Sequence, residues 1–387
     1  MDFYSTNSLS WEQLEYGTKA IMNLHYGLIH VGLPTMVDLT RDNLPNIKED
    51  NMPKNFELCK EGDVAFADAS EDTNEVAKPI EFFDLAGKNI VCGLHTIHGR
   101  DNKNKTVIGF KGYAFSSSAF HNQIRRIAQG TKIYSISTKN LSECFIGIPS
   151  KVEQTKIATL LRLIDERIAT QNKIIEKYES LIKGLNDSLY KQYGNAITTS
   201  FADLGHSYSG LSGKSAEDFG SGKPFITYLN VYSNSVVNEN DYQYVRISDG
   251  EKQNVVKYGD VLFTLSSETP EEVGIGSIYL GKSDVYLNSF CFGIHITDTK
   301  VAFPPYLSYY VSSTPFRKFI YPYAQGSTRF NLCKADFEKA RIKIPSLENQ
   351  KRIYFILSHI ASKVKTETKL LDLFRLQKQS LLRQMFI

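Results

Sequence analysis

Two stretches of the chain repeat apolar residues in steps that alternate between four and three positions. Such a heptad period is the signature of a coiled-coil helix. The first stretch lies within residues 149–193, and the second lies within residues 344–387. We therefore expect one long helix in each. The positions expected to pair are Ile157, Leu161, Ile164, Ile168, Gln171 and Ile175 in the first, and Ile353, Leu357, Ile360, Val364, Glu367 and Leu371 in the second.

Gln171 and Glu367 are the polar members of these two series, and they occupy the same layer of both. A polar residue at a single core position of a coiled coil fixes the register of the helices. The unbroken period favours antiparallel pairing of the two helices with each other. The alternative is that each helix packs separately on its own globular part.

The rest of the chain is a tandem repeat, in which short matched segments recur 196 or 197 residues apart. Ser70-Glu71 and Glu75-Val76 recur as Ser267-Glu268 and Glu272-Val273. Fixed spacing between such segments indicates duplicated structural units. The longer pairs are Gly62–Phe66 with Gly259–Phe263, Ala128–Thr131 with Ala324–Thr328, and Ile148–Ser150 with Ile344–Ser346.

We predict an α+β protein with two similar lobes separated by a long antiparallel two-helix coiled coil, related by pseudo-twofold symmetry. Short strands are expected at Val64–Phe66 and Val261–Thr264, each after a Gly-Asp turn. One strand is expected over Val285–Ile296 and one helix over Pro304–Tyr321. The predicted domains are a first lobe at 1–148, a helix at 149–193, a second lobe at 194–343 and a helix at 344–387.

Composition places the chain among ordinary globular proteins. It has 387 residues, 42% of them hydrophobic, and a net charge of +3. No apolar run approaches the roughly 18 residues that span a bilayer, so no membrane association is expected. Five scattered cysteines without a Cys-x-x-Cys pair argue against a disulfide scaffold and a zinc ribbon. A reduced, cytoplasmic protein without a metal site is the expectation.

Catalytic motifs are not apparent. Gly213-Lys214-Ser215 lacks the first glycine of a phosphate-binding loop, because Tyr208 stands there, and we interpret it as a polar surface loop. Pro304-Pro305-Tyr306 has no acid or amide before it, so it favours a helix N-terminus over a methyltransferase motif. His95, His98 and His295 have no metal-ligand spacing, and Asp63 and Asp260 are expected to stabilise turns.

Basic residues surround the repeated Ala-Gln-Gly-Thr segment in both halves. A glycine turn lets the backbone approach a phosphate, and arginine or lysine neutralises its charge. Loops 41–54 and 207–223 are candidates for reading base edges, although each could equally be a solvated surface loop. The candidate DNA-binding residues are Arg125, Arg126, Lys132, Lys214, Lys223, Arg317, Lys318, Thr328 and Arg329.

Two variable lobes, each followed by Ile-Pro-Ser and a heptad helix, resemble the specificity (S) subunit of a type I restriction-modification enzyme. The most telling segments are Gly259–Phe263, Ala324–Arg329 and Ile344–Ile353, which the first half repeats. The loop Tyr208–Ser215 also resembles the opening of one subfamily of recognition domains. The first lobe has His25–His30 near the corresponding place, so the two lobes are expected to read different sequences.

The resemblance implies that each lobe is a target recognition domain for one half of a bipartite, asymmetric site in double-stranded DNA. The helices would set the spacing and dock two modification subunits, which use S-adenosylmethionine. Two motor-nuclease (restriction) subunits would add ATP- and Mg²⁺-dependent cleavage. The chain itself would hold no cofactor and would not be an enzyme.

Two other functions remain open at this stage. One is a protein–protein scaffold whose lobes bind partners without DNA. The other is an enzyme with a divergent active site. Strong salt dependence of binding would distinguish DNA recognition from the scaffold, and methylation or nicking by the purified chain alone would identify the enzyme.

Overall fold

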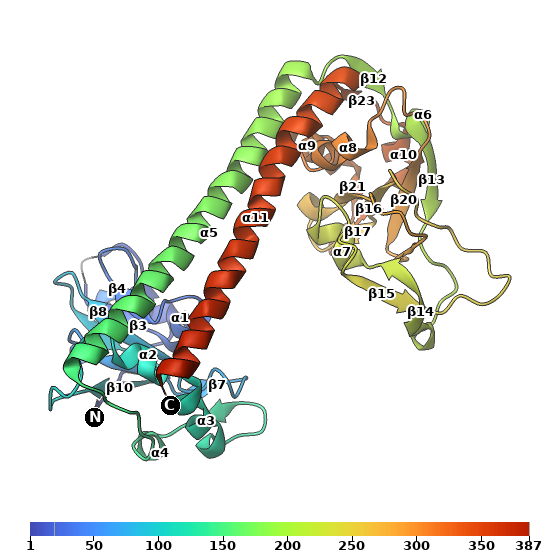
Figure 1. The fold of residues 1–387 in the computed structure, drawn as a ribbon. Helices are drawn as coiled ribbons and strands as arrows, with labels where there is room; N and C mark the ends of the chain where they lie inside the picture. The colour runs from blue at the N-terminus through green and yellow to red at the C-terminus, as the bar shows by residue number, and fades with distance from the viewer. Residues whose placement is uncertain (19, 387) are drawn as a thin grey trace. The chain divides into compact units, whose positions relative to one another are not determined.

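The computed structural model describes residues 1–18 and 20–386. The chain forms two compact units, one made of Met1–Lys173 with Thr368–Ile387 and the other of Ile174–Glu367. Each unit therefore contains one lobe and parts of both long helices (Figure 1). The domain boundaries predicted from the sequence follow chain order and remain predictions.

The first lobe is built on two sheets. The larger sheet has the order β1-β10-β6-β8-β4, and the smaller has the order β2-β5-β3-β9. Their strands are β1 (Asp2–Tyr4), β10 (Thr96–Arg100), β6 (Val64–Ala67), β8 (Pro79–Asp84), β4 (Met36–Asp38), β2 (Leu14–Glu15), β5 (Asn46–Ile47), β3 (Met22–Leu24) and β9 (Ile90–Cys92). A short pair, β7 (Ala69–Ser70) with β11 (Tyr134–Ser135), completes the lobe with helices α1 (Tyr26–Val31), α2 (Lys111–Phe115), α3 (Ser118–Ile127), α4 (Thr138–Leu141) and 3-10 turns η1 (Trp11–Gln13) and η2 (Glu49–Asn51).

The second lobe repeats this plan. Its larger sheet has the order β13-β20-β16-β18, and a second sheet has the order β15-β14-β19. These strands are β13 (Gly205–Ser209), β20 (Cys291–Ile296), β16 (Val261–Thr264), β18 (Gly276–Ile278), β15 (Tyr242–Val245), β14 (Phe219–Ile226) and β19 (Tyr286–Leu287). The remaining elements are β12 (Ile197–Thr199), β17 (Ser266–Ser267), β21 (Ala324–Gln325), β22 (Phe330–Leu332), β23 (Ile342–Ile344), α6 (Phe201–Leu204), α7 (Tyr228–Ser233), α8 (Pro304–Tyr310), α9 (Thr314–Ile320), α10 (Lys334–Lys339), η3 (Ala216–Asp218), η4 (Pro270–Glu272) and η5 (Tyr321–Tyr323).

The predicted duplication is confirmed at the level of strand pairing. In the order β1-β10-β6-β8, each strand corresponds to its counterpart in β13-β20-β16-β18, and all these pairs are antiparallel. The strands predicted at Val64–Phe66 and Val261–Thr264 are the central strands β6 and β16. They are buried at every position, which explains why their apolar sequence is shared between the lobes.

Three predictions about local structure in the second lobe were wrong. The strand predicted over Val285–Ile296 is two strands, β19 and β20, since the chain turns at residues 288–290. The helix predicted over Pro304–Tyr321 is interrupted, because the Ser313 side chain accepts a hydrogen bond from Phe316 N–H and starts α9 anew. The segment 207–223 is not one loop, since it contains the ends of β13 and β14.

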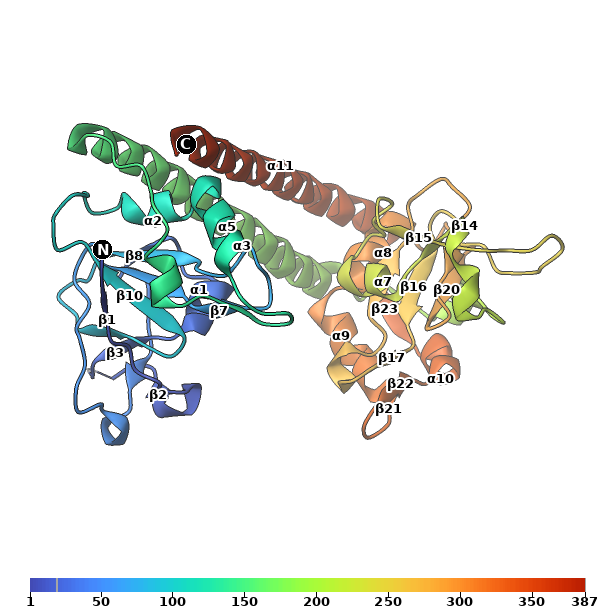
Figure 2. The same ribbon diagram turned by 90° about the horizontal axis from the view of Figure 1, so that it is seen from below.

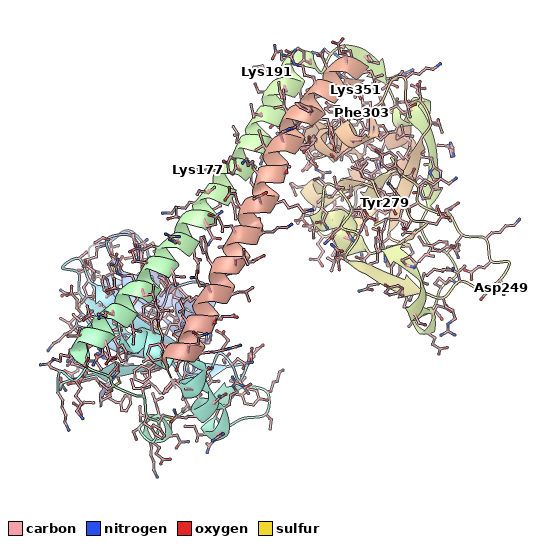
Figure 3. The ribbon with its side chains drawn as sticks, viewed as in Figure 1. Lys177, Lys191, Asp249, Tyr279, Phe303 and Lys351 are labelled. Carbon is pink, nitrogen blue, oxygen red and sulfur yellow. The ribbon has the colours of Figure 1, made fainter. Side chains whose placement is uncertain are left out.

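The helix start predicted at Pro304 is confirmed, with proline in the first turn of α8. The core of the second lobe is rich in aromatic rings. Phe263 of the central strand contacts Phe201, Phe292, Phe316 and Phe337, at ring centroid distances of 5.1–6.1 Å. In the same lobe Figure 3 shows Tyr279 among the strands, whereas Asp249 lies at the tip of a loop.

The two long helices are α5 (Lys151–Tyr193) and α11 (Leu347–Met385). In the first unit, the beginning of α5 lies beside the end of α11, where Lys378 Nζ is 2.6 Å from Asp165 Oδ1. Leu161 of α5 packs in one cluster with Leu381 and Phe386. Figure 2 shows the two helices side by side. Pairing in this unit is therefore antiparallel, as predicted.

In the second unit, the end of α5 shares an apolar cluster with the beginning of α11. Leu185 and Leu189 pack in the same cluster as Ile353 and Leu357. The same helices also pack on the lobe, since Tyr190 and Tyr310 rings lie 5.8 Å apart. Pairing with the other helix and packing on a lobe thus occur together, although the sequence presented them as alternatives.

All twelve positions predicted to pair along the helices are buried or half-buried. Leu161, Ile353 and Leu357 are at most 1% exposed, and Gln171 is 5% exposed. Burial of the polar Gln171 within an apolar series is consistent with the register role predicted for it.

A glutamine near the start of each long helix attaches that helix to its lobe. In the first unit, Gln154 Oε1 accepts from Val107 N–H at 2.9 Å, while its amide nitrogen donates to the carbonyls of Lys105 and Pro149. Gln350 repeats this pattern in the second unit, with Phe303 N–H, Val301 O and Pro345 O at 2.7–2.8 Å. Figure 3 shows Phe303 beside Lys351, the residue that follows Gln350.

Both glutamines are almost fully buried, at 1% and 0% exposure. All six of their partners are backbone groups. Each glutamine and its three partner residues form a set of four, and every member of the first set lies 196 residues before its counterpart in the second. We call this arrangement the glutamine latch.

Candidate nucleic-acid interface

The repeated Ala-Gln-Gly segment forms the same hairpin in both lobes. In the second lobe, β21 pairs with β22 through Gln325 and Asn331, and in the first, Gln129 pairs with Ser135. Each hairpin adds to a short strand that follows the central strand, β7 in the first lobe and β17 in the second. Segments that are more than 60 residues apart in the sequence are therefore adjacent in the fold.

The glycine of each hairpin has a backbone conformation that other residues rarely adopt. Gly130 and Gly326 both have φ of +141°. A Cβ atom would lie 1.9 Å from Ile133 O in the first and 2.1 Å from Arg329 O in the second. Only glycine permits this close turn, which explains why it recurs in both lobes.

We expect Gly130→Ala to distort the first hairpin, because its Cβ would overlap the Ile133 carbonyl. DNA binding through this lobe should weaken by at least about tenfold, the effect of a strain near 1.4 kcal/mol. Gly147→Ala is the matched control, since nothing lies within 4 Å of its Cβ position. Binding is measured by titration of labelled duplex DNA. Equal affinity of the two variants would contradict this prediction.

In the first lobe, the predicted cations surround the hairpin and are exposed. Arg125 and Arg126 belong to the last turn of α3, just before the hairpin, and Lys132 lies within it. A guanidinium or ammonium group that faces solvent beside a glycine turn is suited to contact phosphate.

In the second lobe, the predicted residues separate into two groups. Thr328 and Arg329 are exposed in the hairpin, Lys318 is exposed on α9, and Lys223 is exposed on β14. The Arg329 guanidinium lies 5.9 Å from the ring centroid of Phe290, which is itself 57% exposed. No motif in the sequence links Phe290 to Arg329, which lie 39 positions apart.

Arg317 and Lys214 are engaged inside the lobe instead. The Arg317 guanidinium donates to the carbonyls of Glu271, Val273 and Gly274 at 2.6–2.7 Å, and burial lowers its pKa. The Lys214 ammonium donates to Arg246 O and to the Glu251 carboxylate at 2.6 Å. Hydrogen bonds from Lys214, from Ser248 N–H and from Gln253 together lower the pKa of Glu251 to about 2. Both groups thus anchor loops of the second lobe, and their predicted contact with DNA remains a prediction.

The Gly-Asp turns that enter the central strands carry buried carboxylates. Asp63 Oδ2 accepts from Lys60 N–H at 2.8 Å, and Asp260 Oδ2 accepts from Lys257 N–H at 2.8 Å. Both aspartates are 2% exposed. Each thus closes the turn that enters the central strand, the structural role predicted from the sequence.

The side chains that neutralise these carboxylates differ between the lobes. In the first, Arg100 donates to Asp63 at 2.8–3.1 Å and His98 Nε2 lies 2.7 Å away. In the second, His295 takes the cross-strand position of Arg100, and its Nδ1 lies 2.7 Å from Asp260 Oδ1.

The two lobes also differ at a second position near this carboxylate. Tyr208 donates to Asp260 at 2.6 Å and lies over Gly293, which holds the strand position of His98. A Cβ on Gly293 would lie 2.2 Å from the Tyr208 ring. His98 and His295 are therefore parts of the networks around Asp63 and Asp260. His95 lies outside them and contacts Asp68 at the surface.

The structure also corrects the predicted correspondence between recognition loops. His25 is the N-cap of α1 and Thr227 is the N-cap of α7, and each follows a strand that pairs in parallel with β9 or β19. His25–His30 therefore corresponds to the α7 region. The counterpart of the loop at 210–215 lies earlier, between β1 and β3.

A family model provides independent information about the second lobe. Residues 202–373 match the model described as "Type I restriction modification DNA specificity domain". This segment, less than half of the chain, is therefore similar to that domain family. The matched segment comprises most of the second lobe and the larger part of α11.

Solved structures extend the likeness to the whole chain. The S subunit of the type I restriction-modification system from M. genitalium shares 16% identity, with coverage of 100% of this chain and 93% of that chain and a TM-score of 0.52. A chain from a structure described as "complex assembly and conformational transition of the type I R-M system" shares 16% identity, covers 90% of this chain and 89% of that chain, and has a TM-score of 0.58. This chain thus shares the fold of these two chains. Curated proteins gave no match.

None of the helices within residues 1–18 and 20–386 combines the length and apolar character needed to cross a bilayer.

Proposed function

We propose that this chain is the DNA-specificity subunit of a type I restriction-modification complex. Each lobe binds one part of a bipartite, asymmetric site in double-stranded DNA. The observation that carries this proposal is the duplicated hairpin, which presents a glycine turn and an exposed cation in both lobes. The specificity-domain match in the second lobe supports DNA over a protein partner.

The proposal includes partner subunits that supply the chemistry. Two modification subunits, using S-adenosylmethionine, methylate adenine at N6, and two motor-nuclease subunits use ATP and Mg²⁺. The chain itself is non-catalytic and holds no cofactor for these reactions. Both long helices serve as the dock for the modification subunits.

Exposed leucines on the helices support the docking role. In the first unit, Leu373 and Leu376 of α11 are 61% and 60% exposed, and Leu163 of α5 is 47% exposed. Residues three apart share one face of a helix. An uncovered apolar face of this kind marks an interaction surface.

We expect the double variant Leu373→Glu, Leu376→Glu to lose association with the modification subunit while the chain keeps its folded stability. Charged side chains at the centre of an apolar interface remain unpaired when the interface forms. Gln377→Glu adds a charge at a neighbouring exposed position and serves as the control. Co-purification of the two proteins provides the measurement, and full retention of the double variant would contradict the docking role.

Salt dependence tests the phosphate contacts residue by residue. Arg329→Ala is expected to reduce the slope of log K against log salt by about 1, the effect of one lost phosphate contact. Lys214→Ala should leave the slope unchanged, because its ammonium is engaged with Glu251. The measurement uses the chain bound to its modification subunits. Equal slopes for wild type and Arg329→Ala would exclude a phosphate contact by Arg329.

The function itself is tested by mapping N6-methyladenine in cells that express the modification subunit with and without this chain. We expect one split, asymmetric motif to be methylated only when the chain is present. Gly326→Ala should reduce methylation of that motif. A methylation pattern that is independent of this chain would refute the proposal.

A further inference from the structure

Three buried side chains with metal-binding atoms meet in the first lobe. Cys59 precedes the Gly-Asp turn, Cys92 ends β9, and His98 lies in β10. Their exposures are 5%, 2% and 0%. The two sulfur atoms are 3.5 Å apart, and both lie within 4.8 Å of a ring nitrogen of His98. No other group of three His, Cys, Asp or Glu residues within 1–18 and 20–386 lies so close.

The two ring nitrogens of His98 differ in their hydrogen bonding. Its Nε2 is held by the Asp63 carboxylate at 2.7 Å, whereas its buried Nδ1 has no hydrogen-bond partner. Buried polar atoms are nearly always paired, so an unpaired ring nitrogen needs an explanation. Metal-binding histidines characteristically donate one ring N–H to a carboxylate, which fixes the ring and leaves the other nitrogen for the metal.

In the second lobe, residues without metal-binding atoms occupy the positions equivalent to Cys59, Cys92 and His98. Val256 N–H donates to Val285 O as Cys59 N–H donates to Ile90 O, so Val256 is the counterpart of Cys59. Leu287 pairs with Ile226 as Cys92 pairs with Leu24. Gly293 stands in place of His98, and Val256, Leu287 and Tyr208 pack in one apolar cluster. The fold therefore does not require thiols or imidazole at these positions.

We propose that Cys59, Cys92 and His98 form a binding site for a thiophilic cation such as Zn²⁺. Thiolate and imidazole are the ligands that Zn²⁺ and other soft ions prefer. In a tetrahedral site with Zn–S bonds near 2.3 Å, two sulfur atoms are about 3.8 Å apart, close to the separation seen here. Each thiol releases its proton to solvent as its sulfur–metal bond forms, and two thiolates balance the charge of a divalent ion.

The site would connect three segments of the first lobe that lie far apart in the sequence. It would also act on the turn that enters the central strand, because His98 and Asp63 are joined directly. A bound ion should therefore stabilise the first lobe. This inference is independent of the proposed function, since its readouts are ion binding and thermal unfolding in the absence of DNA.

The test uses the purified full chain, reduced and stripped of metal by dialysis against a chelator. Zn²⁺ is titrated in competition with a chromophoric chelator, and Co²⁺ reports thiolate ligation by its charge-transfer absorption. We expect one equivalent to bind and the thermal midpoint to rise on binding. Cys59→Val with Cys92→Leu copies the second lobe, so this variant should fold and lose both effects. Cys333→Ser, a thiol of the other unit, is the matched control and should retain them.

His98→Gln provides a second variant in case the double variant does not fold. It should weaken Zn²⁺ binding by at least about 100-fold, since even groups outside the metal's first shell are worth about 10–100-fold. If the wild type binds no ion, or if the double variant binds as tightly as Cys333→Ser, the proposal is overturned.

Discussion

Asp63→Asn is expected to lower the free energy of unfolding by about 3–5 kcal/mol, the effect of removing one partner of a buried ion pair. Arg100 is 7% exposed and donates three of its hydrogen bonds to Asp63. Its guanidinium would stay buried with Glu57 Oε1 and the Leu58 carbonyl as its remaining partners. Urea unfolding monitored by circular dichroism provides the measurement.

Asp260→Asn is the matched comparison from the second lobe. Its carboxylate is bound by His295, Tyr208 and a backbone N–H, none of which carries a permanent charge. We expect a loss of only about 1–2 kcal/mol, because neutral hydrogen bonds contribute less and no buried cation is left behind. Equal losses in the two lobes would show that Arg100 is not what makes Asp63 critical.

The effect at Asp63 also has a defined pH dependence. Burial acts to raise the pKa of Asp63, but hydrogen bonds from His98, Arg100 and Lys60 N–H outweigh it and lower the pKa overall. A lowered pKa stabilises the fold above the unfolded value of about 3.9, and this stabilisation is lost as the pH falls below it. The difference between wild type and Asp63→Asn should therefore shrink below about pH 4.

Gln350→Ala is expected to lower the free energy of unfolding by about 3 kcal/mol. The change leaves one buried N–H and two carbonyls without their partner, and each unpaired group costs roughly 1–3 kcal/mol. Gln154→Ala should have a similar effect in the first unit. The unfolding midpoint in urea is again the readout.

Two controls separate hydrogen bonding from packing at the latch. Gln350→Met fills nearly the same volume without hydrogen bonds, so it should be almost as destabilising as Gln350→Ala. Gln192→Ala changes an exposed glutamine at the end of α5 and should alter stability by less than about 0.5 kcal/mol. Full stability of Gln350→Met would mean that the latch acts through volume alone.

The repeat and the helices were predictable because they leave periodic signals. Apolar residues at heptad spacing identified α5 and α11, and the recurring Gly-Asp-Val segment identified the central strands β6 and β16. A glycine with φ of +141° recurs for a steric reason, so it also survives as a match between the halves. Gln154 and Gln350 recur at the same offset, so the sequence also carries a signal for the latch.

The side-chain contacts that the sequence does not reveal are those that depend on strand pairing. Arg100 and His295 hold equivalent positions but differ in chemistry, so no residue match links them. Arg317 and Arg329 are likewise equivalent as basic residues near the repeated motif. In the fold, however, Arg317 donates to three carbonyls and Arg329 is exposed. Cys59, Cys92 and His98 have no ligand spacing because they come from different strands and loops.

The glutamine latch has a consequence for how such chains diversify. Its contacts in the lobe are the backbone groups of residues 105, 107 and 149, and of 301, 303 and 345 in the second copy. Because every residue type offers these groups, and only proline lacks the N–H, the latch itself does not depend on which side chains the lobe carries at these positions. A whole lobe could be exchanged by recombination at the helix boundary, and the incoming cassette would bring its own attachment points. New DNA specificities would then arise without redesign of the helices.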